Sequence, residues 1–177
     1  MQSGVNLPRL AMASLAAGLL VFTSLLAQAL PEDTEQPIHI SADEAIRDER
    51  TGETIYRGNV QMNQGTLRID ADEVTIYRID IEADKIVAVG APAHMQQLRE
   101  VGGEIMHAEG DIIEYYKVEE RVQLRENARL EQDGSTVQGD KIDYFINEQL
   151  VKAIADRSVD EKRRVEVVIP PHKVNDE

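Results

Sequence analysis

Apolar and polar residues alternate along most of this chain, in stretches separated by turn-forming residues. Alternation with a period of two is typical of β-strands that bury one face and leave the other in solvent. The clearest stretches are Ile38–Ile40, Leu67–Ala71, Val74–Ile76, Val122–Leu124, Ile142–Ile146 and Val165–Val167. The pattern therefore predicts an all-β protein.

Turn residues recur at close intervals between these stretches, as at Arg57-Gly58-Asn59 and Asp133-Gly134. Glycine and asparagine favour turns because they tolerate backbone conformations that other residues avoid. The close spacing predicts short strands. Dense charge leaves a helix as the alternative for Ala42–Arg50 and Glu114–Glu126, but the second segment keeps a two-residue period on both sides of a break, so we interpret it as a hairpin.

The chain also contains an internal repeat, marked by a small residue that is directly followed by an acidic one and, further along, by a turn. Four copies begin at Ala42, Ala71, Ala108 and Gly139, with spacings of 29, 37 and 31 residues. A turn and another strand follow each start, so one copy holds about four short strands. Such a unit cannot bury an apolar face alone, so neighbouring copies must stack and share one interior.

Stacked repeats of this kind predict an elongated, twisted double sheet. Its ends are not closed by a barrel seam, so the first and last strands should present unpaired backbone groups. Such edges are templates on which another chain can add a strand.

The first thirty residues have the features of an export signal. Arg9 precedes an apolar run from Leu10 to Leu26, and Ala27-Gln28-Ala29 supplies a small-x-small cleavage pattern. The run reaches the lower limit for spanning a bilayer, so an uncleaved anchor is the alternative. We expect cleavage after Ala29 and a soluble mature protein. The expected divisions are a signal peptide (1–29), a short polar tail (30–37), a β-domain (38–169) and a disordered C-terminal tail (170–177).

The expected mature protein is strongly acidic, with 18 basic against 33 acidic residues and a charge of −15 once Arg9 is removed. The negative electrostatic field of such a protein repels phosphates, so nucleic acid is not an expected partner. The chain has no cysteine and hence no disulfide to stabilise an exported fold. With no Trp, two Phe and five Tyr, aliphatic side chains must form most of the interior.

No catalytic constellation is recognisable in the sequence. The four histidines are isolated and no glycine-rich phosphate loop leads into a helix. The remaining candidates are closely spaced carboxylates, namely Asp70 with Asp72, Asp80 with Glu82 and Asp84, and Asp140 with Asp143. Such sets suit a glycosidase pair or a calcium site, but they are more often the solvated side of an amphipathic strand. We therefore predict neither an enzyme nor a cofactor or metal site.

Several segments follow one another in a characteristic order: Gln36–Ile40, Tyr56–Val60, Gln64–Asp72 and Gln138–Ile142. In this order and spacing they resemble the OstA-like family of lipopolysaccharide transport proteins. The resemblance runs from about Gln36 to about Val168, nearly all of the expected mature chain. Loop lengths depart from the better-known family pattern around Arg78–Lys85 and Lys117–Arg121.

The resemblance implies an elongated, slightly twisted β-jellyroll of stacked antiparallel strands, open along one edge, with an apolar trough for acyl chains. It also implies a periplasmic bridge. In the family, copies join head to tail and link jellyroll domains of an inner-membrane lipopolysaccharide transporter to the amino-terminal domain of an outer-membrane translocon.

Inward side chains are the expected contacts for the lipid A acyl chains of lipopolysaccharide. The candidates are Ile38, Ile40, Ile69, Ile76, Met95, Ile113 and Tyr115, with Arg78 near the mouth to meet an anionic head group. The family motif supports Ile38, Ile40 and Arg78. At each position ordinary core packing is the alternative. Pairing between copies is expected at Ile38, Val165, Val167 and Ile169, with Pro170-Pro171 ending the last strand.

The predicted function is thus periplasmic lipopolysaccharide transport during outer-membrane assembly. A structural or adhesive envelope module is the main alternative, because it would have the same strands and would bind protein edges without lipid. An envelope glycosidase ranks third, because no aromatic platform for sugar rings accompanies the acidic pairs.

Overall fold

The computed structural model describes residues 33–79, 82–98, 102–158 and 161–171. The expected signal peptide and most of the expected C-terminal tail lie outside these residues. Within them, ten strands form one antiparallel sheet, in which β2 pairs with β3 and β9 with β8, off the main order β1-β3-β4-β5-β6-β7-β8-β10. The elements are η1 (Asp33–Glu35), β1 (His39–Ser41), β2 (Glu44–Asp48), β3 (Glu53–Gln64), β4 (Leu67–Ile79), β5 (Glu82–Leu98), β6 (Ile105–Tyr116), β7 (Arg121–Gln132), β8 (Ser135–Phe145), β9 (Leu150–Ile154) and β10 (Glu166–Val168).

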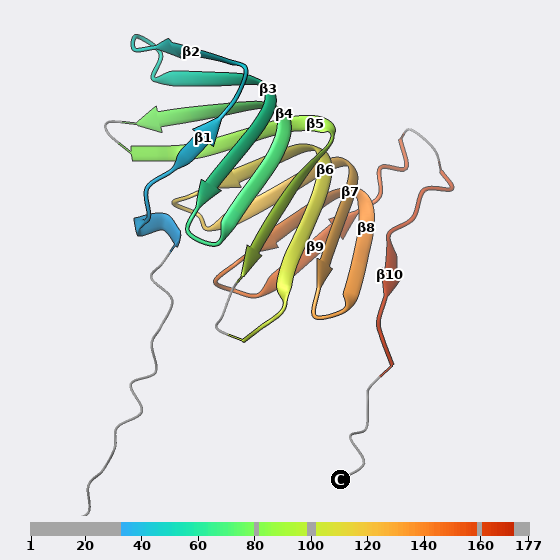
Figure 1. Ribbon diagram of the computed structural model, residues 1–177. Coiled ribbons are helices and arrows are strands. Elements are labelled where there is room, and N and C mark those ends of the chain that lie inside the picture. Colours follow the sequence, from blue (N-terminus) through green and yellow to red (C-terminus); the bar gives the residue numbers. More distant parts are fainter. Residues whose placement is uncertain (1–32, 80–81, 99–101, 159–160, 172–177) are drawn as a thin grey trace, which may run out of the picture.

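The long strands β3 to β8 bend near their middle, and the sheet folds into two facing layers (Figure 1). The pairing register shifts at the bends, for example between Arg57 and Val60 in β3 and between Arg125 and Ala128 in β7. Bulges of this kind add twist and turn a strand from one layer into another. We name the layer that ends in β1 and β10 the first layer and the layer that ends in β2 and β9 the second layer.

Strand length differs from the prediction. The strands β3 to β8 have 11 to 17 residues, so the expectation of short strands is wrong. The reason is visible at Gly58 and Asn59, whose φ angles are 77° and 46°. Two successive left-handed residues produce a bulge inside a strand here, where sequence analysis expected a turn between two strands.

Two local alternatives are also decided by the structure. The segment for which a helix was the alternative contains β2, Glu44–Asp48, which pairs with β3. Its charged residues occupy the edge of the sheet. The hairpin interpretation of Glu114–Glu126 is confirmed, because β6 ends at Tyr116 and β7 begins at Arg121, with the two strands paired.

The internal repeat marks the bends between the layers. The Asn59 side chain donates a hydrogen bond of 2.9 Å to Asp43, and Asn127 donates one of 2.8 Å to Asp111. At the next copy Asp140 accepts a bond of 2.7 Å from the backbone N–H of Asp156. Each pair is separated by 16 residues. In two copies the signature therefore supplies a carboxylate that fastens a bulge, and in the copy at Gly139 it supplies one that binds the backbone just after β9.

The sheet is not closed, as the repeat predicted. At one end β1 and β2 are edge strands, and at the other end β9 and β10 are. Large apolar side chains remain exposed on these edges, including Ile46 on β2, Ile154 on β9 and Val168 on β10. Both ends of the sheet therefore combine free backbone edges with apolar surface. In the described part of the chain, no helix is long and apolar enough to cross a bilayer.

Candidate lipid-binding site

Aliphatic side chains fill the space between the two layers. The large side chains with almost no exposed surface are Met62, Leu67, Ile69, Ile76, Met95, Met106, Ile113, Leu124, Ile142 and Tyr144. They come from six consecutive strands, β3 to β8, because the two-residue alternation turns every second side chain inward. The expectation of a mainly aliphatic interior is confirmed.

One row of inward side chains crosses the whole first layer, from the first edge strand to the last. Its members, each directly opposite the next, are Ile40, Met62, Ile69, Met95, Ala108, Leu130, Val137 and Val167. Opposite residues on antiparallel strands have their Cβ atoms about 5 Å apart on the same face. The row is therefore a continuous apolar stripe, which we name the first-layer row.

Two similar rows cross the second layer. One contains Ala45, Tyr56, Val74, Ala88, Ile113, Leu124, Ile142 and Ala153. The other contains Thr54, Ile76, Ile86, Tyr115, Val122, Tyr144 and Val151. We name these the second-layer rows. Together with the first-layer row they give the interior apolar walls that run along the stack of strands.

Most of the predicted lipid contacts lie in these rows. Ile40, Ile69 and Met95 belong to the first-layer row. Ile113 belongs to one second-layer row, and Ile76 with Tyr115 to the other. The structure thus brings residues that are up to 75 positions apart in the sequence onto facing walls of one interior, and their contact with lipid stays a prediction.

The two remaining candidates lie elsewhere. Ile38 is partly buried against the core, immediately before β1. Arg78 is exposed near the end of β4, where its backbone N–H donates to the carbonyl of Gly52. Its guanidinium is thus outside the rows, at the rim of the second layer.

Burial decreases towards the ends of the first-layer row. The central members Ile69 and Met95 are 0% and 2% exposed, whereas Ile40 is partly buried and Val167 is 54% exposed. Val167 was predicted as a contact between copies, and it is the member of this row on β10. The interior is closed in the middle and accessible at its two ends.

Sequence analysis missed other members of the rows, such as Met62, Leu130 and Tyr144. Met62 follows Val60 and Leu130 follows Ala128 at the same two-residue period, and all are buried. Extending the alternation through the presumed turns would have found them. The omission has the same cause as the error in strand length.

Tyr115 is the most strongly perturbed titratable group of the interior. Burial raises its pKa to about 12, and the negative charges of Glu120 and Asp33 add to this effect. The phenol therefore stays neutral at any physiological pH, and its ring behaves as part of the apolar wall. A neutral hydroxyl at this position does not repel an anionic lipid.

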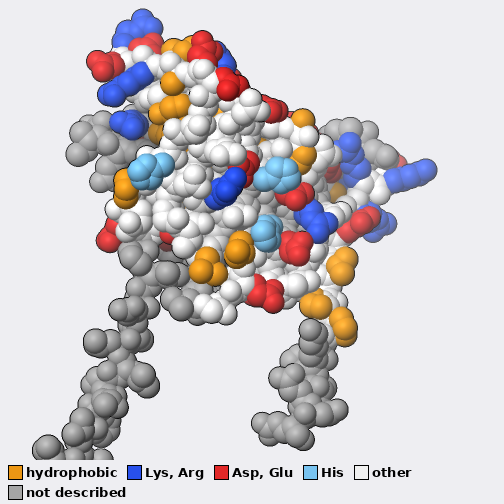
Figure 2. Space-filling model, viewed as in Figure 1, with side chains coloured by type: hydrophobic (Ala, Val, Ile, Leu, Met, Phe, Trp, Pro, Cys, Tyr) orange, Lys and Arg blue, Asp and Glu red, His pale blue; other side chains and the backbone are white. Residues whose placement is uncertain are grey.

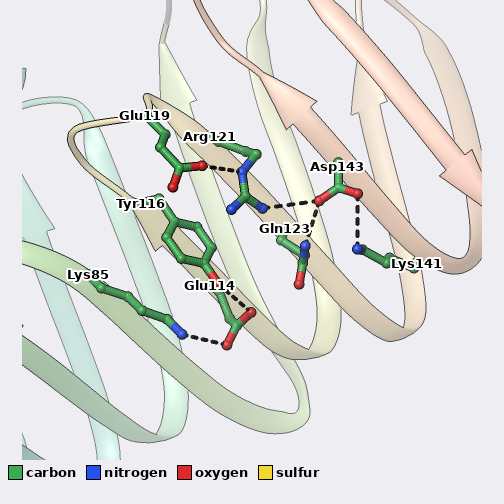
Figure 3. Close-up of polar contacts among 8 residues, drawn as sticks. All are labelled: Lys85, Glu114, Tyr116, Glu119, Arg121, Gln123, Lys141 and Asp143. Atoms are coloured by element: carbon green, nitrogen blue, oxygen red, sulfur yellow. Dashed lines mark hydrogen bonds and ion pairs between the residues drawn. The ribbon is translucent and has the colours of Figure 1, made fainter.

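The outer face of the second layer has a different character, because polar side chains interlock across β5, β6 and β7 (Figure 3). The ammonium of Lys85 lies 2.9 Å from Glu114 Oε1, and the hydroxyl of Tyr116 donates to the other oxygen at 3.1 Å. The Tyr116 ring lies between the charges of Lys85 and Arg121, which are 4.9 and 4.0 Å from its centre. Burial alone would raise the pKa of Glu114, but the hydrogen bonds from Lys85 and Tyr116 outweigh it and lower that pKa.

Asp143 continues this network onto β8. It accepts bonds from Gln123 at 2.6 Å and Arg121 at 3.2 Å, and Lys141 lies 3.2 Å away (Figure 3). Burial opposes ionisation, but the bonds from Gln123 and Lys141 lower the pKa of Asp143. A glycosidase acid needs a raised pKa, so the shift at this carboxylate is opposite to the one that role requires.

The outer face of the first layer is polar as well. Asp70, one of the carboxylates considered for catalysis, is paired with Arg68 at 2.8 Å. His94 Nδ1 lies 3.6 Å from Glu109 Oε1. Figure 2 shows charged and histidine side chains across one face of the molecule, with apolar side chains mainly around its rim. The arrangement places apolar surface inside and at the edges, and charge outside.

Comparison with known proteins identifies relatives over most of the chain. A family model described as LptA/(LptD N-terminal domain) LPS transport protein matches residues 39–150. The lipopolysaccharide export system protein LptH of Pseudomonas aeruginosa is 35% identical over 156 residues, which is 85% of this chain and 88% of LptH. The LptA protein of Escherichia coli is 34% identical over 169 residues, or 92% of this chain and 89% of LptA.

A solved structure agrees with these sequence matches. The crystal structure of P. aeruginosa LptH, described as the LptA-homologous periplasmic component of a lipopolysaccharide transport device, superposes with a TM-score of 0.73 at 33% identity. It covers 80% of this chain and 100% of the LptH chain. The β-jellyroll that the sequence led us to expect is therefore confirmed. This chain belongs to the LptA/LptD N-terminal-domain family of lipopolysaccharide transport proteins.

Proposed function

We propose that this protein carries lipopolysaccharide across the periplasm by holding its acyl chains between the two layers. The observation that supports this most directly is the first-layer row, which is apolar on all eight strands that it crosses, from β1 at one edge to β10 at the other. Its relatives are lipopolysaccharide export proteins, and one is named as the periplasmic component of the transport device.

Transfer energetics explain why a continuous apolar path is needed. Burial of one methylene group is worth about 0.8 kcal/mol, so a lipid with several chains of about a dozen carbons would lose tens of kcal/mol on release into water. A path of near-equivalent apolar positions removes that barrier, because the lipid moves from strand to strand without being exposed. Such a protein needs no hydrolytic activity of its own.

The acyl chains enter where the rows are accessible. In this proposal Ile38 and Ile40 make the first contacts at the β1 edge, and Ile69, Ile76, Met95, Ile113 and Tyr115 contact the chains after the layers separate. Separation is required because these five side chains are at most 5% exposed. Arg78, exposed at the rim, meets the anionic head group.

The strongly acidic charge is compatible with an anionic ligand. Screening limits repulsion between exposed charges to about 8 Å at physiological salt, and burial of hydrocarbon does not depend on charge. Lipid affinity should therefore change little with ionic strength.

Partners follow from the open edges. Copies of the chain join head to tail, with β10 of one copy beside β1 of the next, through Ile38, Val165, Val167 and Ile169. Terminal copies bind jellyroll domains of an inner-membrane transporter and the amino-terminal domain of an outer-membrane translocon by the same strand addition. Residues 1–29 direct export to the periplasm and are removed.

Site-specific photo-crosslinking tests this function. A photoreactive residue at Ile40 or Ile69 faces the interior, whereas His39 and Arg68, the neighbours on the same strands, serve as matched outward controls. We expect lipopolysaccharide to label the inward positions and not the outward ones. Protein crosslinks without lipid at any inward position would favour a structural envelope module instead.

A further inference from the structure

The short turn before β1 is fastened to the ends of three other strands. Asp33, at the start of η1, accepts hydrogen bonds from the Thr66 backbone N–H at 2.6 Å, the Thr66 hydroxyl at 2.7 Å and the Gln97 side-chain amide at 2.6 Å. Thr66 lies in the turn between β3 and β4, and Gln97 lies near the end of β5. One carboxylate thus ties the N-terminal segment to the tips of β3, β4 and β5 in the first layer.

A second set of contacts holds the same segment. The N–H of Gln36 donates to the carbonyl of Asp33 at 3.0 Å, which closes the turn. The Gln64 side chain, only 4% exposed, donates to the carbonyl of Gln36 at 2.9 Å. A buried amide is costly without partners, so the segment also satisfies part of the hydrogen-bonding capacity of the strand end below it.

Backbone packing between the turn and the strands is close. Gly65 has a φ of 58°, and a Cβ atom at this position would overlap the carboxylate of Asp33 and lie 3.1 Å from its Cα. No side chain fits between them. The turn therefore rests directly on the β3–β4 connection (Figure 1).

The interior begins immediately beneath this turn. Leu67, the residue after Thr66, is 2% exposed. The negative charge of Asp33 also adds to the raised pKa of Tyr115, which belongs to a second-layer row. The turn thus covers the tips of β3, β4 and β5 in the first layer, at the place where the buried interior begins.

We propose that residues 33–36 form a latch, fastened by Asp33, whose release opens the side of the jellyroll to acyl chains. The inference rests on the proposed lipid-carrying function and assigns Asp33 as a positioning residue that controls access. The latch is continuous with β1, so movement of the edge strand and release of the latch are coupled through Gln36 and Pro37.

Substitutions at the Asp33–Gln97 contact test the latch. Asp33→Ala removes the acceptor, and Gln97→Glu places a second carboxylate against it. The double variant Asp33→Asn with Gln97→Glu restores a donor and an acceptor with their positions exchanged. Glu35→Ala, an exposed residue of the same turn, is the matched control. Thermal unfolding by circular dichroism checks that each full mature chain folds.

Two readouts are needed. Hydrogen exchange of the Thr66 amide reports the latch itself, and the rate at which lipopolysaccharide labels a photoreactive residue at Ile40 reports access. We expect Asp33→Ala and Gln97→Glu to accelerate both about tenfold, as the loss of a charge-assisted hydrogen bond allows. The double variant should return towards the wild-type rates, and Glu35→Ala should match the wild type.

The outcomes separate the latch from the function on which it rests. Equal labelling rates in wild type and Asp33→Ala, with accelerated Thr66 exchange, would overturn the latch and leave the lipid-carrying function intact. No labelling at Ile40 in any variant would overturn both. Failure of the double variant to restore slow exchange would show that Asp33 and Gln97 do not act as a pair, which also overturns the latch.

Discussion

Substitution of Gly58 by alanine should destabilise the bend between the two layers more than the same change at another left-handed glycine. Both Gly58 and Gly102 have positive φ, 77° and 81°. A non-glycine residue in this region costs about 1–2 kcal/mol, which applies to both sites. At Gly58 the new Cβ would also overlap the carboxylate of Asp43, whereas at Gly102 it has no neighbour within 4 Å.

The additional loss at Gly58 can be worked out from the contacts of Asp43. Displacement of its carboxylate breaks the 2.9 Å hydrogen bond from Asn59, worth about 1 kcal/mol. We therefore expect Gly58→Ala to lower the free energy of unfolding by about 2–3 kcal/mol and Gly102→Ala to lower it by about 1–2 kcal/mol.

Urea unfolding followed by circular dichroism measures both losses, because the chain has no tryptophan. A third variant, Asp43→Ala, isolates the contact. In the Asp43→Ala background the hydrogen bond to Asn59 is already absent, so Gly58→Ala should lower the free energy of unfolding only by the cost of placing alanine in the left-handed conformation. Equal losses at Gly58 and Gly102, or an unchanged cost in the Asp43→Ala background, would refute the assignment of the Asp43–Asn59 pair as the fastening of the bend.

Three other changes test the interior, the outer network and the open edge. Because the pKa of Tyr115 is raised to about 12, the free energy of unfolding should fall by up to about 2–3 kcal/mol as the pH rises from 10 to 12. Urea titrations of Tyr115→Phe should not show this contribution to the fall. The pKa of Glu114 is lowered, so its stabilising effect is present above the pKa of the unfolded chain and is lost as the pH falls through the folded value; Glu114→Gln should weaken the acid dependence of stability below about pH 4. Deletion of residues 165–177 should abolish concentration-dependent association in light scattering without changing the circular dichroism spectrum, and unchanged oligomers would contradict pairing through β10.

The two-residue alternation was sufficient to predict the sheet and its buried face, because both depend on local pattern alone, and the internal repeat predicted its open ends. Strand length was not predictable in this way. Gly58-Asn59 suits a turn between strands and a bulge within one equally well, and only the pairing with β4 on both sides decides between them. The 16-residue spacing of Asp43 and Asn59 carries this information in the sequence, but its meaning depends on knowing which strands are neighbours.

The candidate site shows the same division between local and long-range information. Alternation identified Ile69 as inward, Met95 was a further candidate contact, and the structure places the two opposite each other. Alternation gave no sign that residues 33–36, interpreted as part of a polar tail, would be fastened to Thr66 and Gln97. The contact with Thr66 spans 33 residues of sequence and the contact with Gln97 spans 64. Hydrogen bonds across such distances leave no periodic signal.

The first-layer row also bears on the direction of transport. Its members are aliphatic or Met side chains of comparable polarity on all eight strands, so an acyl chain that follows the row, as proposed, would gain similar energy at each position. A path without a gradient lets lipid move either way, and net flow must be driven by continued loading at one end. Because the row ends at Ile40 on one edge and at Val167 on the other, pairing of β10 with β1 of a second copy would extend the same path, and a single driving step could then move lipid through several copies.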